Sequence, residues 1–278
     1  MTAPDVLDVG SLLRRWRTLR RLSQLELASR ADVSAKHVSF LETGRARPTR
    51  DMLLRLGEHL AIPLRERNEL LLAGGFAPTF PARELSAAPM AAVASAIAKI
   101  LAAQEPNPTL VVDRHWTMIE ANPQVAALTT RCAPWLLEPP VNVLRLALHP
   151  EGLAPHIVNL AQWRHDLLHR LDHQIEATGD ARLRELAREL ASYPPGPPDD
   201  VSSDPACDGT VELVVGLRVR TDFGELSFLS TTTVFGAARD VTVEDLAIET
   251  FFPADAATAG VLRSMVAENA SGVDTGVN

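Results

Sequence analysis

The stretch SQLELASRADVSAKHVSFLETGRARP, residues 23–48, predicts two short helices joined by a tight turn. Ser23 can cap the first helix through its hydroxyl, and Glu26 stands at the position that completes a capping box. Ser34 can cap the second helix in the same way. Between the helices, Asp32 falls where such a turn needs a positive φ, which Asp tolerates better than most residues although less well than Gly. The stretch is therefore predicted to fold as one compact helical pair.

The second helix of this pair carries different side chains on its two faces. Helical spacing directs Val38 and Leu41 toward a core. The same spacing leaves outward a set of small, polar, basic and aromatic side chains, namely Ala35, Lys36, Ser39 and Phe40. Two short helices whose second member exposes non-core side chains fit the major groove of B-DNA. A helical module that binds another protein is the alternative interpretation.

Charge is distributed unevenly along the 278-residue chain, which has a net charge of -8. Residues 1–75 carry 13 Lys and Arg against 9 Asp and Glu, and the remaining residues carry 14 against 26. A basic N-terminal region is suited to contact phosphates, whereas the acidic remainder has no reason to contact nucleic acid. The charge pattern therefore favours two regions with different partners.

Chain length and the positions of Gly and Pro residues also indicate two domains. Gly74 and Gly75 close a helical region, and three prolines follow within a short stretch. We expect a DNA-binding domain at 1–75, a linker at 76–90, a second domain at 91–270 and a disordered tail at 271–278.

Residues 10–75 resemble the XRE-type helix-turn-helix family, the lambda-repressor-like DNA-binding domains, through LSQLELASRADVS, HVSFLETGRARP and LLAGGFAP. The resemblance implies a sequence-specific transcriptional regulator, with the candidate DNA-binding residues Gln24, Ser34, Ala35, Lys36, Ser39, Arg45 and Arg47. The two arginines of this set are expected to contact the DNA backbone. Because one small module binds DNA weakly, we expect a homodimer on a near-palindromic double-stranded operator.

The resemblance also implies roles for single positions. Gln24 is expected to bond a DNA phosphate, and Lys36 is the best candidate for contact with a base edge. Glu42 is expected to form a structural ion pair with Arg17. Ala35 departs from this pattern, because its side chain is too short to hydrogen-bond a base.

The second domain reads as a mixture of helices and strands. We expect a helix at 90–104, a strand–turn–strand over 109–121, a helix opened by Asn122, a hairpin around 222–224, a further strand within 246–255 and a last helix capped by Asp255. The segment 193–209, rich in Pro, Gly, Asp and Ser, predicts a long surface loop. The expected fold class is α+β: an all-α helix-turn-helix domain followed by a PAS-like α/β sensor domain with an antiparallel sheet.

Nearly all of residues 95–263 resemble the MmyB-like ligand-binding domain, a PAS-like module that follows XRE-type domains in bacterial regulators. The resemblance rests on VVDRHW, NVLRLALHPEGLAPHIVNLAQWR, STTTVFG and LAIETFFPADAAT. It implies a small-molecule ligand that modulates DNA affinity, a long-chain fatty acid being one ligand reported for the family. A constitutive regulator whose second domain is only a dimerisation or partner scaffold is the alternative, and a cofactor-bearing sensor or enzyme is a third option.

Five residues of the second domain are candidates for ligand binding. On a helical wheel, Arg164 falls on the apolar stripe of Leu160, and a buried guanidinium needs a partner such as a carboxylate. In VNVLRLALH, polar residues follow i, i+3, i+7 on a segment predicted to be a buried helix. The candidates are Asn142, Arg145, His149, Trp163 and Arg164. Either arginine could anchor an anionic head group, or both could bond internal carboxylates or carbonyls.

Other function classes find little support. His165, His169 and His173 recur every four residues but point opposite the apolar stripe, so we expect no metal. Cys132 and Cys207 are far apart, which argues against a disulfide framework and against zinc. Hydrolase, metalloprotease and phosphate-binding motifs are absent, so we expect neither an enzyme nor a cofactor. With no secretory signal and no apolar run of about 20 residues, we expect a cytoplasmic protein outside the membrane.

Overall fold

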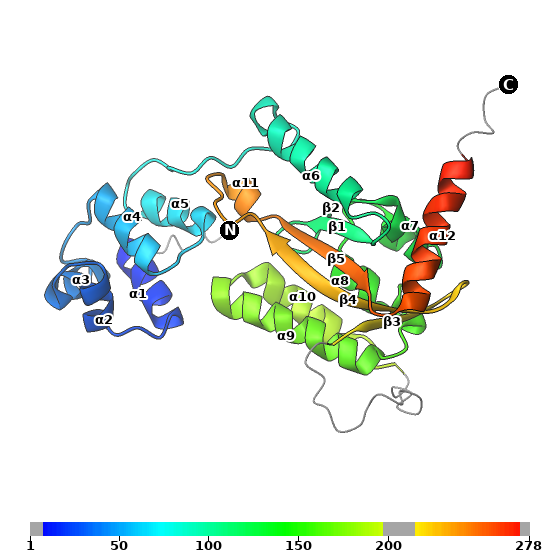
Figure 1. Ribbon diagram of the computed structural model, residues 1–278. Helices are drawn as coiled ribbons and strands as arrows, with labels where there is room; N and C mark the ends of the chain where they lie inside the picture. The colour runs from blue at the N-terminus through cyan, green and yellow to red at the C-terminus, as the bar shows by residue number, and fades with distance from the viewer. Residues whose placement is uncertain (1–7, 197–214, 273–278) are drawn as a thin grey trace. The chain divides into compact units, whose positions relative to one another are not determined.

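The computed structural model of the chain describes residues 8–196 and 215–272 (Figure 1). The chain divides into two compact units. Unit 1 consists of residues 1–90 with the short segments 176–178 and 236–244, and unit 2 consists of residues 91–175, 179–235 and 245–278. The fold class is α+β, as predicted, with a helical unit 1 and a unit 2 that combines helices with one antiparallel sheet.

Unit 1 is built from short, well-capped helices. Its helices before residue 90 are α1 (Val9–Leu19), α2 (Gln24–Arg30), α3 (Ala35–Glu42), α4 (Arg50–His59), α5 (Leu64–Ala73) and the 3-10 turn η1 (Ala88–Met90), and the segment 236–244 adds α11 (Val241–Glu244). The predicted capping box of Ser23 and Glu26 is present, and Ser34 caps α3 by accepting a hydrogen bond from the His37 N–H at 3.1 Å. Asp32 has the predicted positive φ, 51°. Local sequence thus sets where α2 and α3 begin and how they turn.

The crossing of α1 against α3 depends on one glycine. A Cβ atom on Gly10 would lie 2.5 Å from the carbonyl oxygen of Leu41 and 2.8 Å from that of Glu42. A residue larger than glycine would therefore push α1 away from the C-terminal end of α3. The core beneath this crossing contains Leu13, Trp16, Leu27, Val38, Leu41 and Leu53.

Unit 2 contains five strands in the order β2-β1-β5-β4-β3, and every neighbouring pair is antiparallel. The strands are β1 (Thr109–Val112), β2 (Met118–Ala121), β3 (Leu217–Thr221), β4 (Gly224–Val234) and β5 (Ala247–Pro253). The helices are α6 (Ala91–Ala103), α7 (Pro123–Leu128), α8 (Val143–Leu148), α9 (Leu160–Thr178), α10 (Ala181–Ser192) and α12 (Ala256–Gly272), with 3-10 turns η2 (Pro134–Leu137) and η3 (Ala154–His156). The paired helices α9 and α10 lie side by side (Figure 1) and share a core with β3, β4 and α12.

The elements predicted for unit 2 are present in the described residues. Asn122 precedes α7, and β3 and β4 pair as a hairpin around 222–224. Asp255 caps α12 by accepting a hydrogen bond from the Thr258 N–H at 2.7 Å. These elements are set by local residues, because turns and caps act over two to four positions.

Parts of three predictions fall outside the described residues. The polar loop predicted at 193–209 is described only to residue 196, and Cys207 lies in the undescribed part. Residues 271 and 272, predicted to begin the tail, are the last residues of α12, and the remaining residues 273–278 are not described.

Candidate DNA-binding surface and ligand cavity

The third helix of unit 1 buries one face and exposes the other. Val38 and Leu41 are each 1% exposed, so α3 packs on its core through the predicted residues. Lys36 is exposed, whereas Ala35 and Ser39 are half-buried, with Ala35 packed against the edge of the core. The N-terminal half of α3 therefore presents a small surface from which one cation projects.

The aromatic ring of Phe40 on α3 lies close to two basic side chains. The Nζ atom of Lys36 lies 5.5 Å from the centre of the Phe40 ring, and the guanidinium carbon of Arg45 lies 6.0 Å from it. These distances allow cation–π attraction, which orients flexible basic side chains without removing their charge. Arg47, two residues further on, is exposed. Positive charge is thus concentrated at α3 and the loop that follows it.

The predicted ion pair between Arg17 and Glu42 is confirmed. Arg17 donates from Nε to Glu42 Oε1 at 2.6 Å and from Nη2 to Oε2 at 3.0 Å, and it also donates to the Leu22 carbonyl oxygen. The bond to Glu42 raises the pKa of Arg17. The Gln24 side chain donates to Glu42 Oε2 at 2.8 Å, so its expected phosphate contact stays a prediction. This network ties α1 and α2 to the end of α3.

Unit 2 contains an apolar cavity between the sheet and helices α7, α8 and α9, with a volume of about 90 Å³. Its lining includes Leu110, Val125, Leu144, Leu167 and Phe251. Of the five candidate ligand-binding residues, Trp163 lines this cavity, and the other four do not. The cavity therefore offers an apolar surface and one aromatic ring to a bound molecule.

An ion pair that was not predicted from the sequence forms part of the cavity wall. Arg170 donates to Glu249 at 2.8 Å, and the Thr232 hydroxyl donates to the same carboxylate oxygen at 2.7 Å. The Arg170 guanidinium also lies 5.2 Å from the Trp116 ring centre. One signal was available, because Arg170 follows Trp163 by seven residues and therefore shares its helix face. Nothing in the sequence indicated Glu249 as the partner.

The two arginines predicted to anchor a ligand bond to other parts of unit 2. Arg145 donates to Glu189 from Nε at 2.7 Å and from Nη2 at 2.8 Å, and this bond lowers the pKa of Glu189. Arg164 donates to four carbonyl oxygens at the C-terminal end of α10, those of Leu190, Ala191, Tyr193 and Pro194, at 2.8 to 3.0 Å. Cations stabilise a helix C-terminus in this way. Both arginines have the internal partners that the alternative interpretation expected.

The polar residues of VNVLRLALH were predicted to lie on a buried helix, and this prediction is wrong for their side chains. The Arg145 side chain is 43% exposed, and Asn142 and His149 are half-buried. Asn142 caps the helix, accepting a hydrogen bond from the Arg145 N–H at 3.1 Å. The ring of His149 packs edge-on at 5.0 Å between centroids against both Trp135 and Tyr193. These contacts give Asn142 and His149 structural roles.

The remaining candidate groups show no metal-binding geometry. His165, His169 and His173 are exposed, as predicted. Among the described residues, no group of three His, Cys, Asp or Glu side chains is arranged to hold a metal. Burial raises the pKa of Cys132 to about 11, which keeps this thiol protonated at neutral pH. Within the described ranges, none of the helices combines the length and the apolar character needed to cross a bilayer.

A capped helix pair that exposes basic side chains, joined to a separate unit with an apolar cavity, defines a DNA-binding regulator that also carries a small-molecule domain. A family model described as a helix-turn-helix domain matches residues 8–70. The model described as the MmyB-like transcription regulator ligand binding domain matches residues 93–265, which is more than half of the chain. The chain belongs to this family, and it is a DNA-binding helix-turn-helix transcription regulator with a ligand-binding domain.

Comparison with solved structures adds little to this assignment. A structure described as "Structure of an RNA-binding Light-Oxygen-Voltage Receptor" is 14% identical, with a TM-score of 0.24 over 95% of this chain and 64% of that chain. The chain thus spans less than two thirds of that structure's length. The comparison with curated proteins gives no match.

Proposed function

We propose that this regulator changes its affinity for an operator when a fatty-acid-like molecule occupies the cavity of unit 2. The observation that carries the proposal is the combination, in one chain, of an exposed cationic α3 with an apolar cavity lined by Trp163 and Phe251. Since one helix-turn-helix unit binds DNA weakly, the active species is a homodimer on a near-palindromic operator.

The DNA contacts divide into base and backbone contacts. Lys36 is the exposed cation of α3 and reads a base edge, while Ala35 and Ser39 lie against the groove. The exposed Arg45 and Arg47 contact phosphates, which position the protein without reading sequence. Gln24 and the α3 cap Ser34 complete the set through phosphate contacts.

The lining of the cavity indicates the class of ligand. Its wall consists almost entirely of aliphatic and aromatic side chains, and the one ion pair in it is internally neutral. An acyl chain fits such a wall, because burying apolar surface contributes roughly 25 cal/mol per Å². A volume of about 90 Å³ is smaller than the ~300 Å³ of common ligand pockets, so side chains must move as a long chain enters.

The chain offers a covalent route for coupling. Residues 236–244, which connect β4 to β5, belong to unit 1. There Glu244 accepts a hydrogen bond from the Leu64 N–H at the start of α5 at 2.6 Å, and Asp240 pairs with Arg83 at 3.0 Å. The next element, β5, carries Phe251 of the cavity wall. A shift of β5 on ligand binding would therefore displace residues 236–244, which are bonded to other residues of unit 1.

Replacing Lys36 with alanine is expected to weaken operator binding by about 1–3 kcal/mol, because a base-edge contact of this kind is lost. The operator would first be located by footprinting upstream of the protein's own gene and of its neighbours. Binding would then be measured by fluorescence anisotropy at fixed salt. Lys99→Ala, at the exposed lysine of α6, is the matched control and should bind like the original protein. Equal affinities for both variants would contradict the assignment of Lys36.

A constitutive regulator whose unit 2 is only a dimerisation or partner scaffold is the second candidate. Native mass spectrometry of the purified chain separates the two functions. An acyl-sized adduct that leaves on delipidation, together with a change in operator affinity, supports sensing. A dimer that binds the operator equally with and without added dodecanoate supports the scaffold.

A further inference from the structure

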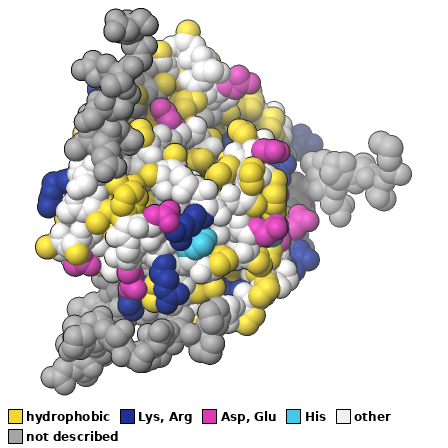
Figure 2. Space-filling model, turned by 90° about the vertical axis from the view of Figure 1, so that its right-hand side faces the viewer, with side chains coloured by type: hydrophobic (Ala, Val, Ile, Leu, Met, Phe, Trp, Pro, Cys, Tyr) yellow, Lys and Arg dark blue, Asp and Glu magenta, His cyan; other side chains and the backbone are white. Residues whose placement is uncertain are grey.

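Unit 2 has a second hollow, larger than the apolar cavity and with a volume of about 310 Å³. It is formed by the end of α7 and the turn after it, by η3, by the β3–β4 hairpin and by α12. Apolar side chains from these elements line part of it, including Leu128, Val219, Leu226 and Met265. Basic side chains, a carboxylate and a histidine gather among hydrophobic side chains on one face of the molecule in Figure 2.

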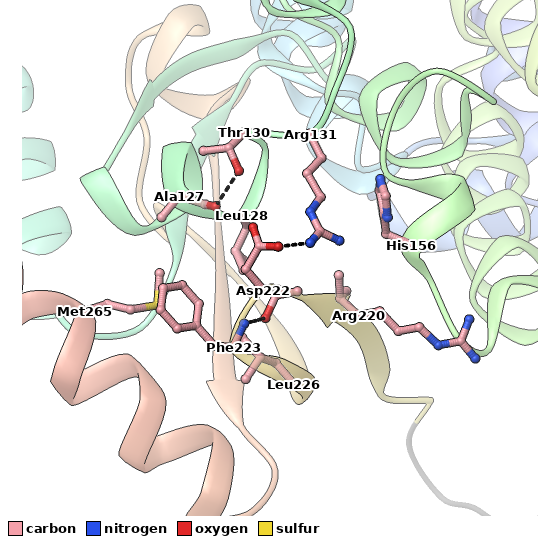
Figure 3. A pocket seen from close by; sticks show the side chains of 12 residues that line it. Ala127, Leu128, Thr130, Arg131, His156, Arg220, Asp222, Phe223, Leu226 and Met265 are labelled. Carbon is pink, nitrogen blue, oxygen red and sulfur yellow. Dashed lines mark hydrogen bonds and ion pairs between the residues drawn. The ribbon is translucent and has the colours of Figure 1, made fainter.

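The polar side of this hollow contains one accessible guanidinium. Arg131 forms an ion pair with Asp222, and its guanidinium lies between Asp222 and His156 in Figure 3. The side chain of Arg220 also lines the hollow, but its guanidinium points away (Figure 3). Burial, followed by the charge of Arg131, lowers the pKa of His156, which disfavours the protonated ring as a competitor for an anion. Arg131 is therefore the group best placed to receive one.

The hollow and the apolar cavity share a wall. Leu128 lines both of them. On β3, Leu217 lines the cavity and Val219, two residues later on the same face, lines the hollow. Next to them, Ile157 lines the cavity while its neighbour His156 lines the hollow. The two spaces therefore meet at the side chain of Leu128.

The two arginines beside these spaces differ in how freely they can change partner. Arg170 holds a Glu249 side chain that is only 5% exposed, and withdrawing the arginine would leave a buried carboxylate uncompensated. Arg131 holds an Asp222 side chain that is 71% exposed on a hairpin turn. An exposed ion pair of this kind contributes little stability, because water solvates the released carboxylate. A ligand carboxylate can therefore replace Asp222 on Arg131 far more easily than Glu249 on Arg170.

We propose that the hollow is the head-group site of the regulator: Arg131 binds the carboxylate of an amphipathic acid whose chain passes Leu128 into the apolar cavity. This inference rests on the proposed ligand-sensing function and adds to it the anchoring residue and the route of entry. Asp222 holds Arg131 in place until the acid arrives and is released to solvent when it binds.

The test measures binding of two probes, dodecanoate and dodecan-1-ol, to the purified full-length chain by titration calorimetry. Arg131→Gln is expected to weaken dodecanoate binding by about 10- to 100-fold, the size of a lost charge-assisted contact, and to leave dodecan-1-ol binding within about twofold. Arg263→Gln, at an exposed arginine of α12 that does not line the hollow, is the matched control and should bind both probes like the original protein. Leu128→Trp, which fills the shared wall, should weaken both probes.

The outcomes separate this inference from the function on which it rests. Dodecanoate binding to Arg131→Gln that equals binding to Arg263→Gln would overturn the head-group site while leaving the acyl-sensing function in place. Failure of the original protein to bind either probe would overturn both. The thermal unfolding midpoint of each variant is compared with that of the original protein, to show that the variants are folded. Arg131→Lys keeps the positive charge and should therefore recover part of the dodecanoate affinity that Arg131→Gln loses.

Discussion

Replacing Arg17 with methionine is expected to lower the free energy of unfolding of unit 1 by about 3–5 kcal/mol, the cost of leaving a buried charge without its partner. The Glu42 side chain is 2% exposed and receives two hydrogen bonds from Arg17. Methionine supplies neither bond, and Gln24 alone cannot neutralise the carboxylate. Because Glu42 is the last residue of α3, operator binding should fall with stability.

Chemical denaturation followed by tryptophan fluorescence measures this change, since Trp16 lies in the core of unit 1. Arg14→Met, at an exposed arginine of the same helix, is the control for loss of one positive charge. Adding Glu42→Leu to Arg17→Met should recover much of the lost stability, because the unpaired carboxylate is then gone. A loss no larger than that of Arg14→Met would show that the pair contributes nothing beyond surface charge.

Replacing Arg170 with methionine should destabilise unit 2 by a similar amount, about 3–5 kcal/mol. Glu249 lies in β5 with its side chain 5% exposed. Without Arg170 it would keep the hydrogen bond from the Thr232 hydroxyl but lose the opposing charge. Arg170 also packs over Trp116, and that contact would disappear as well. The expected result is a lower unfolding midpoint and an altered fluorescence of the tryptophans that line the cavity.

Urea unfolding of the full chain measures this second effect. Arg184→Met, on the exposed side of α10, is the control. The double variant Arg170→Met with Glu249→Gln should be more stable than the single variant, because glutamine carries no charge that needs a partner. If the single and double variants unfold at the same midpoint, the ion pair does not stabilise unit 2.

Local features of both units were predictable because they depend on residues close in the chain. The capping box of Ser23 and Glu26 acts over three positions, and the positive φ of Asp32 follows from its place in a short turn. The hairpin around 222–224 depends on the same kind of local turn chemistry. The Arg17–Glu42 pair, 25 residues apart, was expected from resemblance to a family and not from spacing.

The ligand side was harder to predict, because a helical wheel assigns a face and not a partner. The wheel correctly placed Leu160 on a buried helix face, but it could not show that Arg164 reaches the carbonyl oxygens at the end of α10. It also could not distinguish Arg145, which meets Glu189, from an arginine facing the cavity. Arg131 gave no signal at all, since it lies in a turn and not on a periodic face.

The sequence by itself determined the helix caps, the turns, the core-facing residues of α3 and the β3–β4 hairpin, because each depends on preferences that act within a few residues. Only the tertiary structure decided which arginines face a cavity and which are already bound. That choice depends on carboxylates and carbonyls brought in from distant segments, such as Glu249, 79 residues from Arg170, and Asp222, 91 residues from Arg131. A guanidinium is always charged, and its function is set by the group that folding places beside it.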